Sequence, residues 1–151
     1  MTLTPFHIAI PVRDIDEARY FYGHLMGLTE GRSAPEWIDF NMFGHQFVVH
    51  LDKSLGKDGQ VNTLSNQVDG QGVPVPHCGV VLELEDWHAL RDQVSAFIDR
   101  FVVEPQVRFE GQAGEQRTMF FLDPSGNALE FKAFRHIDAQ LFAIDPPSTE
   151  R

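Results

Sequence analysis

Two histidines and one glutamate stand at positions of this chain where they could bind a metal ion. His7 and His77 each open a run of residues typical of a β-strand, and Glu130 lies within a third such run. Because side chains alternate along a strand, each of the three shares a face with a small Ala or Gly, while larger apolar residues point the other way. Two imidazoles and one carboxylate facing one cavity fit the arrangement that holds Fe(II) or another divalent metal and leaves coordination positions open. The pattern therefore predicts a metal site formed by His7, His77 and Glu130.

Two further histidines are candidates for catalysis. His50 interrupts the apolar run from Phe47 to Leu51. An imidazole there is either a fourth metal ligand or a base next to the other three. His45 stands at the turn before the same run, where it is a candidate acid or base outside the ligand set. A lone strand histidine is more often a hydrogen-bonded polar residue than a ligand, so this interpretation depends on the coincidence of all these positions.

The elements that would position these residues occur twice. The segment FHIAIPVRDIDEARYFYGHLMG, starting at Phe6, is echoed weakly by PHCGVVLELEDWHALRDQVSAFIDR, starting at Pro76. Both segments predict a strand, an acidic turn and a helix. Asp14 and Asp86 are the expected helix caps, and Gly27 suits the end of the first helix.

The repeat places residues of ligand type at matching positions. His7 and His77 correspond at an offset of 70 (77 − 7), and an offset of 80 between the later portions places His50 on Glu130 (130 − 50). Shorter extended runs follow each helix. We expect strands at 37–42 and 46–51 in the first half and at 107–109, 118–122 and 128–134 in the second, with DPSGN as a turn.

One domain spanning residues 1–151 is expected, of the α+β class, with two βαβββ modules. The first module covers about 5–52 and the second about 75–134. Between them, about 53–74 is rich in Gly, Asn, Ser and Asp and is predicted to be a connection that is mobile in part. The tail, 135–151, contains DAQLFAI, which could form one short helix.

Composition excludes several classes of function. Twelve Lys and Arg against 22 Asp and Glu give a formal charge of −10, which disfavours nucleic acid and anionic membranes as partners. The chain contains no apolar stretch of the roughly 20 residues that a bilayer requires. A single cysteine, Cys78, and the lack of a signal-like start favour a reducing cytoplasm.

The chain resembles the vicinal oxygen chelate superfamily, which includes glyoxalase I, extradiol dioxygenases and bleomycin resistance proteins. The resemblance rests on FHIAIPVRDIDEARYFYGHLMGL at the start of the first module and MFFLDPSGNALEFKAF at the end of the second. It implies curved half-barrel sheets around a central metal cavity, with ligand positions at His7, His50, His77 and Glu130. It also implies a small-molecule substrate with two neighbouring oxygens and a homodimer, with the site either within one chain or across two.

Three activities remain open within this resemblance. Extradiol dioxygenases use two histidines and one glutamate, which matches His7, His77 and Glu130 and favours Fe(II) or Mn(II). Glyoxalase-type isomerases usually have a glutamate where this chain has His50, and would favour Zn(II) or Ni(II). Drug-binding resistance proteins usually lack the ligands. We rank the dioxygenase-like oxidoreductase first.

Four residues are candidates for substrate binding. Lys132, Arg108 and Arg117 could each contact an anionic group of the substrate, and Phe109 could supply an apolar wall. Solvated surface charge and core packing are the competing interpretations for these residues.

Overall fold

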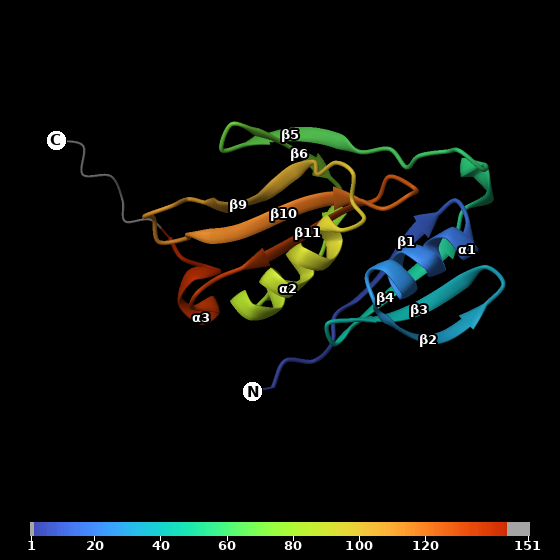
Figure 1. The fold of residues 1–151 in the computed structure, drawn as a ribbon, viewed down its shortest axis with the longest axis horizontal. Helices are drawn as coiled ribbons and strands as arrows, with labels where there is room; N and C mark the ends of the chain where they lie inside the picture. The colour runs from blue at the N-terminus through green and yellow to red at the C-terminus, as the bar shows by residue number, and fades with distance from the viewer. Residues whose placement is uncertain (1, 145–151) are drawn as a thin grey trace.

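The structure is a computed structural model that describes residues 2–144 (Figure 1). The elements, in chain order, are β1 (His7–Val12), α1 (Ile15–Ala18), η1 (Arg19–Leu25), β2 (Thr29–Ala34), β3 (Trp37–Met42), β4 (His45–Leu51), η2 (Lys53–Leu55), β5 (Leu64–Val68), β6 (Gln71–Val75), β7 (His77–Cys78), β8 (Val81–Leu82), α2 (Leu84–Ser95), β9 (Val103–Arg108), β10 (Gln116–Leu122), β11 (Ala128–Ala133) and α3 (Ile137–Gln140).

Two sheets repeat one topology. The first has the strand order β1-β4-β3-β2, and the second has β7-β11-β10-β9 with β8 also paired to β11. In the first sheet β1 lies parallel to β4, and in the second β7 and β8 both lie parallel to β11. The remaining pairs in these two sheets are antiparallel. This arrangement confirms the predicted α+β fold with two βαβββ modules.

The first helix begins and ends where predicted. The Asp14 side chain accepts a hydrogen bond from the backbone N–H of Glu17 at 2.7 Å, and Gly27 has a φ of 73°, the left-handed conformation usual just beyond a helix. The Glu17 carboxylate binds Arg13 at 2.8 Å, so the reciprocal half of a capping box is not formed. After one α-turn the helix widens into η1, a π-helix from Arg19 to Leu25.

The second helix differs from the prediction. Helix α2 starts at Leu84, its N-cap is Glu83, and the cap makes no side-chain hydrogen bond. Asp86 therefore lies in the first turn, where its charge favours the helix dipole but does not cap the helix.

The strand before α2 is also shorter than expected and is split into β7 and β8 around Gly79. A Cβ at Gly79 would collide with the carbonyl oxygen of Glu130. A glycine is therefore required for the backbone to pass this close to β11.

Strand bounds shift elsewhere in the second module. Strand β9 covers Val103–Arg108, whereas 107–109 was expected. It pairs with β10 with a register shift between Thr118 and Phe120, and Phe109, at a φ of 54°, lies beyond its end. The hairpin turn at Phe43 and Gly44 has positive φ at both residues (50° and 89°) and is confirmed. Helix α3 forms at Ile137–Gln140 in the tail, whose residues 145–151 lie outside the described part.

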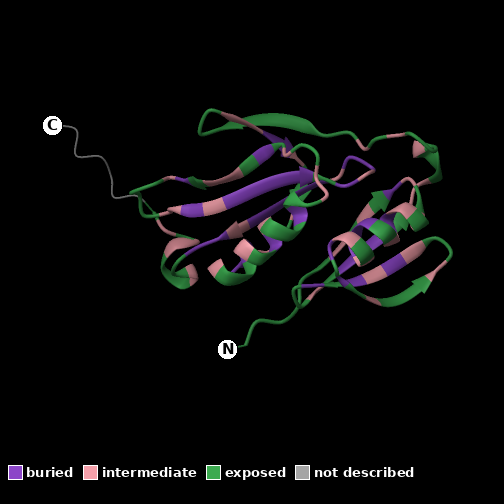
Figure 2. Ribbon diagram, viewed as in Figure 1, coloured by how far each residue is buried: buried purple, intermediate pink, exposed green. Residues whose placement is uncertain are grey.

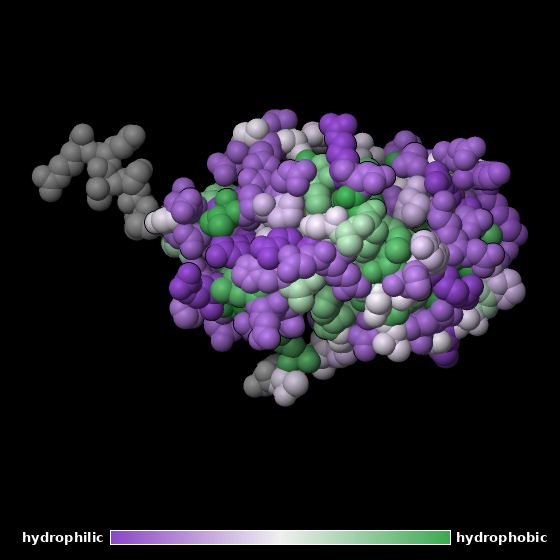
Figure 3. Space-filling view, viewed as in Figure 1, coloured by the Kyte–Doolittle hydropathy of each residue, from purple (hydrophilic) through white to green (hydrophobic). Residues whose placement is uncertain are grey.

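A single core joins the modules. The rings of Phe21 in η1 and Phe97 after α2 lie 5.7 Å apart, and those of Phe43 and Phe131 lie 5.9 Å apart. Figure 2 shows β10 buried along most of its length and β5 exposed throughout. Hydrophobic residues also gather at the surface where the modules meet (Figure 3). In the described residues, none of the helices has the length and hydropathy to span a membrane.

The connection between the modules contains a hairpin. Strands β5 and β6 pair antiparallel from Leu64 to Val75 and lie beside β9 and β10 in Figure 1. Part of the segment that was expected to be a connection mobile in part therefore packs against the second module. Gln71 of β6 hydrogen-bonds to Gln106 of β9 at 3.1 Å.

Candidate metal centre

His77 and Glu130 form one pair of candidate ligands. His77 pairs with Ala128 across parallel strands β7 and β11, and Glu130 follows two residues later on the same face. The Nε2 atom of His77 lies 3.4 Å from Oε2 of Glu130. The other ring nitrogen, Nδ1, lies 2.6 Å from the carbonyl oxygen of Pro74. Because a carbonyl only accepts, Nδ1 carries a proton, which leaves Nε2 as the ring nitrogen that a metal could bind.

The carboxylate of Glu130 is held from two sides. Its side chain is only 7% exposed. The hydroxyl of Thr118 donates to Oε1 at 3.2 Å, and Nζ of Lys132 lies 3.3 Å from the same oxygen. These contacts offset the cost of burying a carboxylate. They also leave Oε2 directed to His77.

The ring of His7 in the first module is also held by a contact at its Nδ1 atom. Its Nδ1 lies 2.7 Å from Oε1 of Gln46. The amide nitrogen of Gln46 donates to Asp39 at 3.2 Å, which leaves Oε1 as the acceptor. Nδ1 of His7 therefore carries the proton, and its Nε2 is free to bind a metal. Gln46, Thr118 and the Pro74 carbonyl were not predicted, because their roles come from contacts between strands.

The strand register corrects the position of His50. His7 pairs with Gln46 across β1 and β4, as His77 pairs with Ala128 across β7 and β11. The residue that corresponds to Glu130 is therefore two residues beyond Gln46, which is Val48. His50 pairs with Pro11 and stands two residues further along the same face. The offset of 80 was thus wrong by two residues, and the fourth ligand position holds an apolar side chain.

His45 does not join the site. Its Nδ1 accepts a hydrogen bond from the backbone N–H of Phe6 at 2.8 Å. Along β4, His45 alternates with Gln46 and so lies on the face opposite His50. The prediction that it acts beside the ligands is not supported by this geometry.

Cys78 has no place in the ligand set. It is adjacent to His77 on the opposite face of the short β7 strand. Burial raises the pKa of its thiol to about 11, and the charge of Asp123 acts in the same direction. The side chain is therefore a protonated thiol at neutral pH.

The three candidate ligands do not form a complete group in the described part of the chain. Among residues 2–144, no group of three or more His, Cys, Asp and Glu side chains is placed to hold a metal ion. His77 and Glu130 lie together in the second module, and His7 lies on β1 of the first.

The candidate substrate residues divide into two groups. Lys132 and Phe109 line a cavity of about 300 Å³ between the second sheet and α3, and Arg108 contacts Phe109 with its guanidinium 5.3 Å from the ring centre. Arg117 pairs with Val107 and Ala133 on the opposite face of the sheet, where it lines a cavity beside Trp87 and α2. Arg117 therefore does not face Glu130, and that prediction is corrected.

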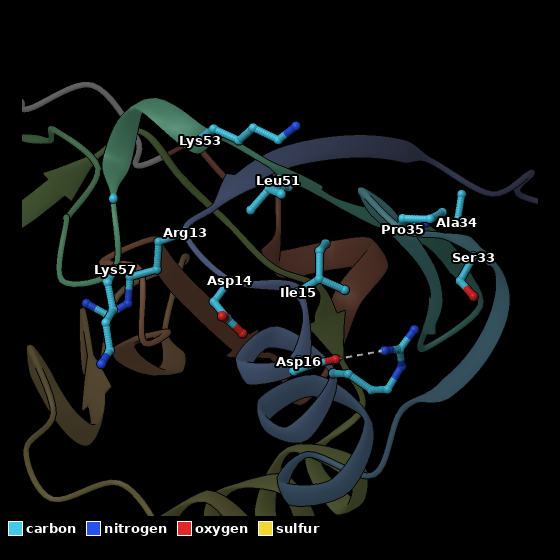
Figure 4. Close-up of a pocket in the computed structure, with 12 residues that line it drawn as sticks. Arg13, Asp14, Ile15, Asp16, Ser33, Ala34, Pro35, Leu51, Lys53 and Lys57 are labelled. Carbon is cyan, nitrogen blue, oxygen red and sulfur yellow. Dashed lines mark hydrogen bonds and ion pairs between the residues drawn. The ribbon is translucent and has the colours of Figure 1, made fainter.

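A larger cavity lies elsewhere, beside the start of α1. It has a volume of about 650 Å³ and contains no histidine (Figure 4). Several of its charged side chains are paired, including Arg13 with Glu17, Arg19 with Glu30 and Lys53 with Glu36. The cavity offers no constellation that matches the predicted chemistry.

Known proteins place this chain in a family. Residues 4–131 match the model of the glyoxalase/bleomycin resistance protein/dioxygenase superfamily. A glyoxalase/bleomycin resistance protein/dioxygenase from Alicyclobacillus acidocaldarius is 31% identical, with a TM-score of 0.71 over 89% of this chain and 94% of that one. No match was found among curated proteins.

More distant structures share the fold. Lactoylglutathione lyase from Agrobacterium tumefaciens is 16% identical, with a TM-score of 0.56 over 95% of this chain and 97% of that one. A genomically encoded fosfomycin resistance protein from Listeria monocytogenes is 17% identical, with a TM-score of 0.53 over 89% and 95%.

The chain belongs to the glyoxalase/bleomycin resistance protein/dioxygenase superfamily. The resemblance seen in the sequence is thereby confirmed. Members of this superfamily bind small molecules, are often metal-dependent enzymes and often form dimers.

Proposed function

We propose that this protein is a metal-dependent oxidoreductase of the extradiol ring-cleaving dioxygenase type. The observation that carries the proposal is the register of β1 and β4, which leaves Val48 at the fourth ligand position. Two histidines and one carboxylate remain, the set typical of Fe(II) oxygenases with open coordination positions. A glyoxalase-type isomerase would be expected to have a carboxylate in place of Val48.

The ligand set suits Fe(II) or Mn(II). His7, His77 and Glu130 would hold the ion, each through an atom whose orientation is fixed by a neighbouring group. A divalent metal at such a site binds two adjacent substrate oxygens and favours their deprotonated form.

The remaining residues would position the substrate and move its proton. His50 is exposed on the face that carries Val48, which suits an imidazole that accepts a proton from a substrate hydroxyl. The ring of Phe120 stands edge-on to His77 at 5.0 Å and supports its orientation. The unpaired Cys78 suits a reducing compartment such as the cytoplasm.

We further propose that the active protein is a homodimer whose metal sites lie across the two copies. The separation of His7 from His77 and Glu130 within one chain supports this arrangement. In a symmetric pair, His7 of one copy would join the other two ligands of its partner at two equivalent sites.

Metal loading followed by an activity assay tests the proposal. Protein without a His tag would be loaded anaerobically with Fe(II) or Mn(II), its metal content measured, and O₂ uptake followed with a panel of catechols. We expect one metal per chain and O₂ consumption with a yellow ring-cleavage product. Turnover of a thiol–aldehyde adduct with Ni(II) or Zn(II), and none of any catechol with Fe(II), would instead identify an isomerase. Failure to bind any transition metal would identify a binding protein.

A further inference from the structure

Arg108 is a buried cation without a counter-charge. Its residue is 5% exposed, and none of the ion pairs among residues 2–144 includes it. One terminal nitrogen donates to the carbonyl oxygen of Val68 at 2.6 Å. Its Nε is buried and has no hydrogen-bond partner in the described part of the chain.

Such a guanidinium is costly to leave unpaired. Arginine stays protonated at every accessible pH, so it cannot neutralise itself when it is buried. The carbonyl oxygen of Val68 and the ring face of Phe109 replace only part of the hydration that the guanidinium of Arg108 loses on burial. The free Nε and its neighbouring terminal nitrogen form the edge of the guanidinium that binds a carboxylate through two parallel hydrogen bonds.

Arg108 lies on the same face of the second sheet as Glu130 of the candidate metal centre. Arg108 pairs with Gln116 on β10, and Glu130 pairs with Phe120 on the same strand. All four side chains therefore share one face of the sheet. Along β10 the two pairs are four residues apart, which is about 13 Å at about 3.3 Å per residue. A ligand that reached both would carry its anion at the end remote from the metal.

The surface between these two points favours an anionic ligand. The pairs between them bring Gln106, Thr118 and Lys132 to this face, and none of these carries a negative charge. Lys132 and Gln116 also line the cavity of about 300 Å³ next to Phe109. This cavity offers room for a substrate body beside the row of side chains that runs from Glu130 toward Arg108.

The β5–β6 hairpin covers this path. Gln71 and Gln106 exchange hydrogen bonds of 3.1 and 3.0 Å, and Val73 packs with Val103 and Phe120 in a small separate cluster. Together with the Val68 contact, these interactions hold the hairpin on the sheet, while β5 itself is exposed along its whole length. A carboxylate bound through Nε of Arg108 and the terminal nitrogen that donates to Val68 would compete with the Val68 carbonyl, so the hairpin would have to shift.

We propose that Arg108 binds a carboxylate at the end of the substrate remote from its two chelating oxygens, and that the β5–β6 hairpin moves to admit it. This inference rests on the proposed function for the identity of the site, and it narrows the substrate to a carboxylate-bearing compound with vicinal oxygens. Arg108 exchanges a neutral carbonyl for a charged acceptor when the substrate binds, so the anion stabilises the bound state.

The first experiment uses metal-free protein and observes the Nε–H group of Arg108 directly. The Nε–H signal of Arg108, assigned in the wild-type protein by side-chain NMR correlation and checked with Arg108→Lys, is followed during titration with 3-phenylpropionate. We expect a saturable downfield shift, and no shift with the neutral 3-phenylpropanamide. A signal that does not respond to the acid would make Arg108 a structural anchor of the hairpin and overturn the inference.

The second experiment uses Fe(II)-loaded protein without oxygen. The affinities of 3-(3,4-dihydroxyphenyl)propionate and its methyl ester are compared in the wild type, in Arg108→Gln and in Arg117→Gln, which alters the opposite face of the sheet. We expect the wild type and Arg117→Gln to prefer the acid by about ten-fold or more, as for a charge-assisted hydrogen bond, and Arg108→Gln to lose the preference.

The outcomes distinguish the proposed carboxylate site at Arg108 from the proposed metal-dependent function. If both compounds bind equally to the wild type, the carboxylate site is wrong and the metal chemistry stands. If neither binds to the metal but the Arg108 signal responds in metal-free protein, the carboxylate site stands and the proposed function is wrong.

Discussion

At the scale of the residue, tautomers and register define the candidate centre. His7 and His77 both use Nδ1 to donate to an oxygen acceptor, Gln46 in one module and Pro74 in the other. This similarity is a better argument for paired ligands than residue type alone, because in both rings it leaves Nε2 as the nitrogen available to a metal. Register then distinguishes Val48, which takes the ligand position, from His50, which does not.

His50→Ala is predicted to keep its metal and lose turnover. The imidazole stands two residues beyond the ligand position, so its removal should leave metal content unchanged and lower kcat by about 100-fold or more, the size of a general-base effect. His7→Ala should lose the metal. Metal analysis and steady-state kinetics check both variants, with His88→Ala on α2 as a matched histidine control. Loss of metal from His50→Ala would show that His50 is a ligand after all.

At the scale of the element, one hydrogen bond links the two modules through their helix and turn. The hydroxyl of Tyr22 in η1 donates to Asp123 at 2.7 Å, across 101 positions of sequence. Asp123 also accepts from the backbone N–H groups of Ser125 and Asn127, so it closes the DPSGN turn between β10 and β11. Burial raises the pKa of Asp123 above its ordinary value of 3.8, and the hydrogen bonds from Tyr22 and Asn127 partly oppose that rise.

Tyr22→Phe is predicted to destabilise the fold by about 1–3 kcal/mol at neutral pH, because a buried carboxylate loses a donor. Urea unfolding at a matched protein concentration measures the effect. Tyr20→Phe, which removes a hydroxyl from a residue that is 57% exposed, should change stability by less than about 0.5 kcal/mol.

The same variant should show a defined pH dependence. Because the folded pKa of Asp123 is raised, its contribution to stability is fully present below 3.8 and is lost as pH rises through the folded value. Without Tyr22 the folded pKa rises further, so the stability difference between Tyr22→Phe and the wild type should grow from acidic to neutral pH. Carboxyl NMR titration of Asp123 checks the direction, and an unchanged or lowered pKa in the variant would contradict it.

At the scale of the whole molecule, the proposed site would be shared between two copies of the chain. Helices α1 and α2 each cover one face of the sheet in their own module (Figure 1). The candidate ligand His7 lies on β1 of the first module, and His77 and Glu130 lie on β7 and β11 of the second. Two copies related by a twofold axis could bring the halves together at two equivalent sites.

A mixture of two inactive variants should therefore recover activity. When His7→Ala and Glu130→Ala are co-expressed, each mixed dimer has one site with all three ligands intact. About a quarter of wild-type activity is expected, since about half of the dimers are mixed and one of their two sites is native. His77→Ala with Glu130→Ala is the control, because both changes fall in the same half and no site is restored. Equal lack of activity in both mixtures would place the site within one chain.

Local patterns in the sequence determined the modules, the Asp14 cap, the Gly27 stop, the hairpin turns and the strand positions of His7, His77 and Glu130. Strand periodicity and turn chemistry act over a few residues, so these features can be predicted without knowing what packs where. The α2 cap could not be predicted, because packing decided where that helix begins. The pairing of β1 with β4 joins residues about 40 positions apart, and only the tertiary structure decided its register. That register replaced His50 by Val48 at the position equivalent to Glu130, because strand alternation changes face with every residue of shift. In the second module, the pairing of β10 with β9 and β11 placed Arg117 on the face opposite Glu130, and the β5–β6 hairpin covered Arg108.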